Sequence, residues 1–140
     1  MSLSNSTENA ILELIFKATT WANLADNTST SPATTLTVAL HTADPGDGGN
    51  MTTNECAYTS YARVTVARTG SGWVVTDNSV SPAASIDFPA ATGGSETATY
   101  ASIGTGVSNN IIVSGAISPT IAISDGVTPK LTTSTAFTLS

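Results

Sequence analysis

The residue types that most often carry chemistry gather in one stretch of this sequence, ALHTADPGDGGNMTTNECAYTSYARV, at residues 39–64. It contains the only histidine of the chain, His41, and the only cysteine, Cys56. It also contains the acidic residues Asp44, Asp47 and Glu55. An imidazole beside a hydroxyl or thiol could act as the base of a hydrolase, and a histidine with several carboxylates could hold a metal ion.

A hydrolase that uses His41 as its base is the first hypothesis for this stretch. His41 ends a predicted strand and Cys56 precedes the next one, so the two side chains could meet. The residues between them are turn formers, and they include no Gly-x-Ser-x-Gly turn of the kind that presents a nucleophilic serine. We therefore expect no catalytic residue here, and we expect Cys56 to be a buried structural side chain.

The spacing of the possible metal ligands fits neither common type of site. Zinc sites use Cys or His pairs a few residues apart, and calcium loops alternate oxygen ligands around a glycine before a bidentate glutamate. Asp44-Pro45-Gly46 predicts a β-turn instead, because Pro45 fixes φ at the first corner and Gly46 accepts a positive φ at the second. Asp44 can accept a hydrogen bond from the backbone of that turn. We therefore expect no metal and no cofactor.

The first element that must position this stretch is a helix from about Ser6 to Asn23. It is predicted because apolar residues recur there at the 3.6-residue period. The apolar stripe is wider than a helix resting on one sheet requires. It predicts a contact with a second copy of the chain, most simply in a homodimer, with a trimer as the alternative. The predicted interface residues are Ile11, Leu12, Leu14, Ile15, Phe16 and Trp21. In a rival interpretation, one face meets the strands and residues 24–35 cover the flank.

The remainder of the chain alternates short apolar runs with turn residues, which is typical of antiparallel strands. Strands are predicted at residues 35–41, 61–69, 72–76, 85–90, 96–104, 109–117, 119–124 and 135–140. The second and third are expected to form a hairpin around residues 69–72, and the fifth and sixth another. The pattern predicts an all-β fold, an antiparallel jelly roll or β-sandwich of about eight strands, with one N-terminal helix. Residues 1–24 would form a helical arm and residues 25–140 the β domain.

Charge is sparse, since only 10% of the residues are charged and the net charge is −6. The four basic residues are scattered along the sequence, so we expect no contact with nucleic acid or with an anionic membrane surface. No apolar run approaches the roughly 20 residues that a membrane span needs. Such a surface, rich in Thr and Ser, suits a protein that is covered by partners.

The stretch at residues 39–64 also contains a possible ion pair. Tyr61 and Arg63 lie two residues apart and so share one face of a strand. We predict that Arg63 pairs with an acidic residue of the loop at 41–55 and holds that loop in place. The residues predicted to take part are Asp44, Glu55, Tyr61 and Arg63.

Four motifs follow one another in a distinctive order. They are LTVALHTADPGDGGN at residues 36–50, NECAYTSYARVTV at 54–66, IDFPAAT at 86–92 and GVTPKLTTSTAFTLS at 126–140. In this order the sequence resembles a family of small tailed-phage virion proteins, whose members are often labelled tail or tail-fibre proteins. Some members resemble capsid cement, or decoration, proteins with a jelly-roll fold.

The resemblance implies a cement or decoration protein that binds the outer surface of a tailed-phage head and clamps neighbouring subunits of the phage major capsid protein. Its alternative is a structural protein of the tail fibre or baseplate. A carbohydrate-binding module is a further alternative, since sugars often stack on aromatic rings that a surface presents. The rings available for this are Trp21, Tyr58, Tyr61, Trp73 and Tyr100.

Overall fold

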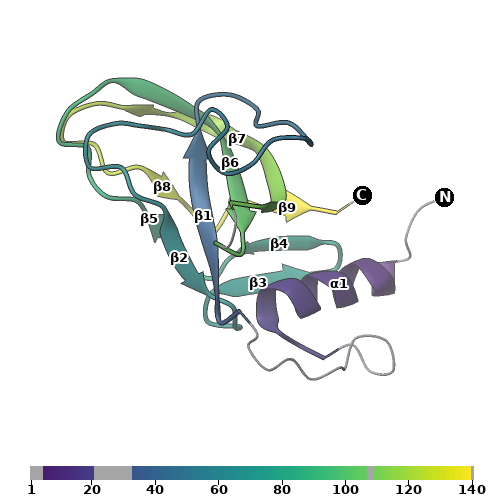
Figure 1. Ribbon diagram of the computed structural model, residues 1–140. Coiled ribbons are helices and arrows are strands. Elements are labelled where there is room, and N and C mark those ends of the chain that lie inside the picture. The colour runs from purple at the N-terminus through teal and green to yellow at the C-terminus, as the bar shows by residue number, and fades with distance from the viewer. Residues whose placement is uncertain (1–4, 21–32, 107–108, 140) are drawn as a thin grey trace.

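The computed structural model describes residues 5–20, 33–106 and 109–139 of the 140-residue chain. In this part of the chain one helix, α1 (Asn5–Lys17), lies beside a set of antiparallel strands (Figure 1). The strands are β1 (Thr35–His41), β2 (Val64–Ala67), β3 (Trp73–Thr76), β4 (Ser79–Pro82), β5 (Ile86–Asp87), β6 (Glu96–Gly104), β7 (Ile111–Ile123), β8 (Lys130–Leu131) and β9 (Phe137–Thr138). The prediction of an all-β sandwich of about eight strands with one N-terminal helix is confirmed. The finer jelly-roll arrangement stays a prediction.

The strands form three hydrogen-bonded sheets. The largest has four strands in the order β2-β1-β6-β7, a second has the order β3-β4-β9, and the third pairs β5 with β8. One apolar core joins all three sheets. Its largest fully buried side chains include Phe16 from α1, Leu36 and Leu40 from β1, Trp73 from β3 and Phe88, which follows β5.

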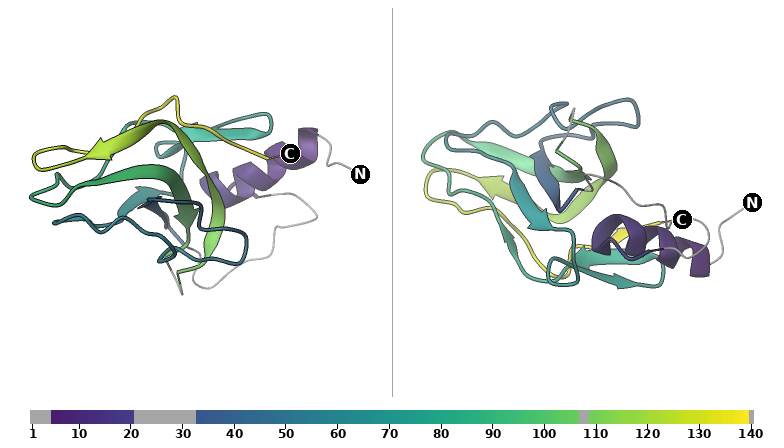
Figure 2. Two further views of the ribbon diagram at one scale, coloured as in Figure 1. Left: turned by 90° about the horizontal axis from the view of Figure 1, so that it is seen from above. Right: turned by 60° about the horizontal axis from the view of Figure 1, so that its bottom comes forward.

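Helix α1 packs on the second sheet, alongside β3 and β4 (Figures 1 and 2). Leu12 and Phe16, one turn apart, are its buried apolar residues. The Phe16 ring meets the Trp73 ring edge to face, with the centroids 4.9 Å apart and an interplanar angle of 69°. The helix is neither long enough nor apolar enough to cross a membrane.

The helix ends at Lys17, so the prediction that it continues to about Asn23 is wrong. Ala18 adopts a left-handed conformation with φ of 55°, and the Thr19 amide donates to the Glu13 carbonyl at 3.1 Å. The Arg68 guanidinium donates to the carbonyls of Leu14 and Ile15 in the last turn. These carbonyls have no partner within a helix that stops here, so Arg68 caps it. Trp21 and most of the 24–35 segment lie outside the described residues.

The pairing of β2 and β3 differs from the predicted hairpin. Residues 69–72 do form a turn, in which the amides of Gly72 and Trp73 donate to the Thr69 carbonyl at 3.0 and 3.1 Å. Beyond it, however, β3 enters the second sheet and pairs with β4, whereas β2 pairs with β1 in the first. Strand β4 was not predicted, because Val80 is its only strongly apolar residue.

Strand β7 is continuous where two strands had been predicted, and it forms the expected antiparallel hairpin with β6. Ala98 pairs with Ile121 and Tyr100 with Ala116, so residues 117–120 form a bulge opposite the single residue Thr99. Pro119 lies in this bulge, where the strand at the sheet edge needs no amide from it. The short strand β8 lies at residues 130–131, where no strand was predicted.

Strand β1 is buried on both faces, from Leu36 to His41. Alternate residues of a strand point to opposite sides, and on one side Leu36, Val38 and Leu40 enter the core. The other side is covered by the loop at 42–54, called the covering loop below. Its Met51 is fully buried, and the Met51 sulfur lies 3.0 Å from where a Cβ on Gly104 would stand. The chemistry-bearing stretch is thus positioned as a cover for the four-stranded sheet.

Candidate functional site

The covering loop begins and ends at one point of the sheet. His41, the last residue of β1, forms an antiparallel bridge with Glu55. On either side of this bridge the Cys56 amide donates to the Leu40 carbonyl at 2.9 Å, and the Thr42 amide donates to the Asn54 carbonyl at 2.8 Å. The two ends of the loop are therefore held by the same kind of backbone hydrogen bonds as a strand pair.

The interior of the loop is held by turns of its own. The Gly46 amide donates to Asp44 Oδ1 at 2.8 Å, and Gly46 has a φ of 71°, as the predicted turn requires. Asn54 Nδ2 donates to the Asp44 carbonyl at 3.0 Å. At Gly49 the backbone passes so close to Pro45 that a Cβ would stand 2.0 Å from the Pro45 carbonyl oxygen. Asp44 therefore stabilises its own turn rather than pairing with Arg63.

Arg63 and Glu55 form an ion pair at the base of the loop. Arg63 Nε lies 2.6 Å from Glu55 Oε1, and Nη2 lies 2.7 Å from Oε2, which is the bidentate arrangement of an arginine and a carboxylate. The Tyr61 hydroxyl also donates to Glu55 Oε1 at 3.0 Å and accepts from the Leu40 amide at 3.1 Å. Arg63 Nη1 donates to Asn109 Oδ1 at 2.6 Å. The cluster thus joins the loop, β1 and the β6–β7 connection.

These contacts determine the charge states in the cluster. The carboxylate of Glu55 beside the guanidinium raises the pKa of Arg63, which keeps its positive charge. Burial raises the pKa of the Tyr61 hydroxyl, so it stays neutral and acts as the donor to Glu55. The cluster therefore contains one ion pair and one neutral hydroxyl, and neither charge of the pair lacks a partner.

His41 lies beneath the loop with an exposed fraction of 0%. Its Nδ1 is 2.8 Å from the Thr53 carbonyl oxygen and its Nε2 is 2.7 Å from Ser102 Oγ. Burial lowers the pKa of the imidazole. Because a carbonyl can only accept, the neutral ring donates from Nδ1 to Thr53 and accepts the Ser102 hydroxyl proton at Nε2.

The contact of Ser102 with His41 has the geometry of a nucleophile and its general base, with the Thr53 carbonyl in the place of the group that orients the imidazole. Sequence analysis did not identify Ser102, which is on β6 and 61 residues from His41. No local motif marks it. Ser102 and His41 are both 0% exposed, and neither lines a described cavity. In this arrangement the pair can satisfy buried polar atoms but cannot reach a substrate.

Cys56 is a free and buried thiol, as expected from sequence. Burial, with the nearby Glu96 carboxylate as a smaller cause, raises its pKa to about 12. The thiolate that would act as a nucleophile is therefore absent at neutral pH. Glu96 itself accepts the amides of Ala57 and Tyr58, each at 2.9 Å, and so anchors the chain after the loop. Within the described residues, no three His, Cys, Asp or Glu side chains gather in a way that could hold a metal ion.

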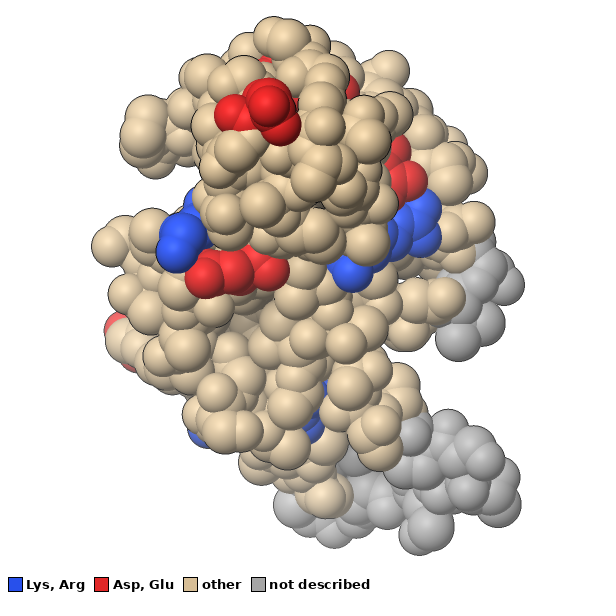
Figure 3. Space-filling view, turned by 90° about the vertical axis from the view of Figure 1, so that its left-hand side faces the viewer, with Lys and Arg blue, Asp and Glu red and all other residues tan. Residues whose placement is uncertain are grey.

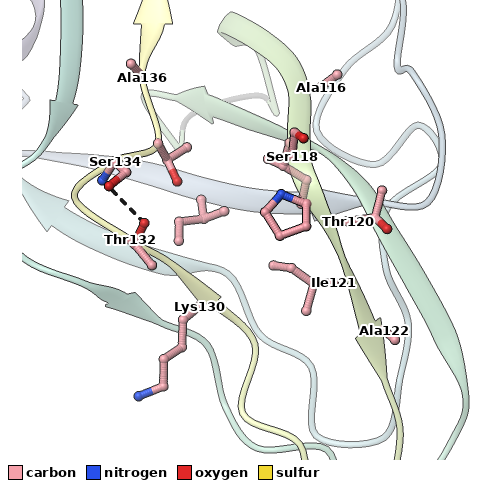
Figure 4. A pocket seen from close by; sticks show the side chains of 13 residues that line it. Ala116, Ser118, Thr120, Ile121, Ala122, Lys130, Thr132, Ser134 and Ala136 are labelled. Carbon is pink, nitrogen blue, oxygen red and sulfur yellow. Dashed lines mark hydrogen bonds between the residues drawn. The ribbon is translucent and has the colours of Figure 1, made fainter.

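A groove of about 570 Å³ lies between the β7 bulge and the segment at 130–136 (Figure 4). Its walls carry aliphatic side chains and the hydroxyls of Ser118, Thr120, Thr132, Ser134 and Thr135. No aromatic residue lines it. Of the described rings that could stack on a sugar, Trp73 and Tyr58 are buried and Tyr61 stacks on Phe88 at a centroid distance of 6.3 Å. Tyr100 on β6 is half-buried.

Fold and site together define a small antiparallel β-sandwich protein in which the cluster of Glu55, Tyr61 and Arg63 holds a loop against a sheet. Residues 2–136 match the family model described as Podophage GP4 fiber I protein gp80. This match spans nearly the whole chain, and the protein belongs to that family of phage virion proteins. The resemblance to phage virion proteins is confirmed at this level. No curated protein matches the chain.

Proposed function

We propose that this protein is a structural component of a phage fibre. The observation that carries the proposal is the match of residues 2–136 to a family whose description names a fibre protein. Of the hypotheses that the sequence raised, the tail-fibre protein agrees with this description better than a cement protein bound to the major capsid protein does.

The surface supports a role in assembly. On the face shown in Figure 3, acidic and basic side chains occupy a few small areas, some of them side by side, and most of the surface consists of uncharged residues. Burying uncharged surface against a neighbour avoids the large cost of removing unpaired charges from water. The low charge of the chain therefore suits a subunit that is packed among other proteins of a virion.

We also propose that this role requires no catalysis, metal or cofactor. The support is that Ser102 and His41 are fully buried and that burial also raises the pKa of the Cys56 thiol to about 12. The purified protein is expected to contain no stoichiometric metal and to hydrolyse no ester or peptide substrate. Metal analysis and an esterase assay of the wild type and of His41→Ala would test this. An activity or a bound metal that the variant loses would contradict it.

Location and copy number in the virion test the fibre role. Antibodies against this protein, detected by electron microscopy of intact particles, are expected to label a fibre rather than the head. Quantitative mass spectrometry of the same particles should give a copy number far below that of the major capsid protein. Labelling over the whole head, with a copy number close to that of the major capsid protein, would overturn the fibre proposal in favour of the cement protein.

A further inference from the structure

His41 is enclosed between the covering loop and β6. Its exposed fraction is 0%, and both ring nitrogens are engaged. Nδ1 lies 2.8 Å from the carbonyl oxygen of Thr53 in the loop, and Nε2 lies 2.7 Å from Oγ of Ser102 on β6. The imidazole therefore links the loop directly to a strand of the sheet. Because the charge of a histidine ordinarily changes between about pH 5 and 8, this link contains a titratable group.

A second proton on the ring does not suit this arrangement. In the neutral state Nε2 accepts the hydroxyl proton of Ser102. Once Nε2 carries its own proton it must donate to Ser102 Oγ, and the hydroxyl proton has to turn to another acceptor. Ser102 is 0% exposed, and within the described part of the chain His41 is the one hydrogen-bond partner of its hydroxyl. Protonation beneath the closed loop therefore leaves a buried hydroxyl without an acceptor, as well as a charge removed from water.

The charged groups nearest to the ring oppose one another. The Glu55 carboxylate favours the protonated imidazole, and the Arg63 guanidinium favours the neutral one. These two groups are bound to each other at 2.6 Å, and the Tyr61 hydroxyl also donates to Glu55 rather than to the ring. On β6, the residue paired with His41 is Tyr100, which brings a phenol to this position. Burial is the largest influence on the ring, and it lowers the pKa of His41.

The covering loop is the segment whose movement would give the ring access to water. It lies on the side of β1 opposite to the core, and most of its residues are exposed. It joins the sheet through the isolated bridge of His41 with Glu55, and its middle is attached by the buried Met51, whose amide donates to the Asn109 carbonyl at 2.9 Å. A segment with few buried contacts opens at a lower cost in free energy than the strands beneath it.

We propose that His41 is an acid-sensitive latch, and that protonation of its imidazole releases the covering loop from β1 and β6. Opening lets water hydrate the new charge and accept the hydroxyl proton of Ser102. The open state therefore binds the proton more tightly than the closed state, and the open fraction rises as the pH falls. An imidazole in water has a pKa of about 6.5. Release should begin below that pH and increase by up to about tenfold per pH unit, until the closed state is itself protonated.

Hydrogen exchange of the wild-type protein between about pH 7 and 5 tests the latch. The amides of Thr42 and Met51 report on the loop, because their hydrogen bonds hold it closed. After correction for the intrinsic pH dependence of exchange, their protection should fall by up to about tenfold per pH unit below about pH 6.5. The amides of Ala83 and Phe88, which donate to carbonyls outside the loop, are the control and should keep their protection.

His41→Gln is the matched variant, because its amide can donate and accept hydrogen bonds but does not titrate in this range. In this variant the protection of the loop amides should be the same at both ends of the pH range. His41 is the only histidine of the chain, so no other imidazole can replace its titration. The comparison of loop and control amides in the wild type does not depend on the folding of this variant.

Three results would each overturn the latch. The first is loop protection that stays constant over the whole pH range in the wild type. The second is an equal loss at the loop and control amides, which would mean that the domain unfolds as a whole. The third is a loss of loop protection that persists in folded His41→Gln, which would assign it to another group. None of these outcomes bears on the fibre role.

Discussion

Arg63 and Glu55 form a bidentate ion pair, with N···O distances of 2.6 and 2.7 Å, at the point where the covering loop returns to β1. Their side chains are only 23% and 16% exposed. A partly buried arginine with two parallel hydrogen bonds is held in one geometry, unlike the exposed pairs that contribute little to stability. The pair therefore connects the residue that precedes β2 to the residue that follows the covering loop.

Arg63→Ala is expected to lower the free energy of unfolding by about 1–3 kcal/mol, because Glu55 and Asn109 both lose a donor. Chemical denaturation measures the change. Arg63→Lys should recover only part of it, since lysine cannot form the bidentate pair. Lys130→Ala, which breaks the exposed pair of Lys130 with Asp87 at 3.2 Å, is the control and should have almost no effect. Equal stability of Arg63→Ala and the wild type would contradict the proposed anchoring of the loop.

Stability should fall as the pH falls below about 6.5, the usual pKa of histidine. Burial lowers the pKa of His41 in the folded protein, so in this range the unfolded chain binds more protons than the folded one. The contribution of His41 is therefore complete above the unfolded pKa and is lost as the pH falls through the folded one.

The His41 titration can be observed directly, because the chain contains a single histidine and hence a single imidazole Hε1 signal. An NMR titration of the folded protein should give a pKa below 6.5. In the urea-unfolded chain the same proton serves as the control and should titrate near 6.5. A folded value at or above the unfolded one would contradict the buried, neutral state of His41.

Neighbouring glycines in the covering loop should respond differently to the same substitution. Gly49→Ala places a Cβ 2.0 Å from the Pro45 carbonyl oxygen, so the backbone must shift, at a cost of about 1–3 kcal/mol. Gly48→Ala meets no atom within 4 Å and should leave the unfolding free energy almost unchanged. Thermal denaturation of both variants measures this difference in stability. Similar melting temperatures for the two would show that the loop does not pass as close to Pro45 as described.

The C-terminal end of α1 should loosen when Arg68 is replaced. Arg68→Ala removes the donors to the carbonyls of Leu14 and Ile15, and the loss of a capping interaction costs about 1 kcal/mol. Hydrogen exchange of the amides in the last turn of the helix should become faster. Lys17→Ala, which breaks the Lys17–Glu13 pair one turn apart on the same helix, is the control and should change exchange much less. Unchanged exchange in Arg68→Ala would mean that the helix ends without this cap.

The sequence alone was sufficient for features that depend on neighbouring residues. Apolar alternation located β1 at its observed bounds, Thr35–His41, and the turn residues between β6 and β7 predicted their hairpin. The order Asp44-Pro45-Gly46 likewise predicted the positive φ of Gly46 and the hydrogen bond from its amide to Asp44, whereas the turn closed by a backbone hydrogen bond lies at residues 46–49. Each of these rests on side-chain periodicity or on the φ preference of single residues, which act over a few positions of the chain.

Features that depend on distant residues were decided by the tertiary structure. The helix ends at Lys17 with a cap from Arg68, about fifty residues further along the chain. His41 pairs with Ser102, 61 residues away, and the alternating pattern of β1 predicted neither that partner nor the loop that buries the second face. Periodicity shows which side of a strand is apolar, but it does not show what covers the other side. That depends on which segments meet when the chain closes, and buried polar atoms must then find partners among whichever residues lie there.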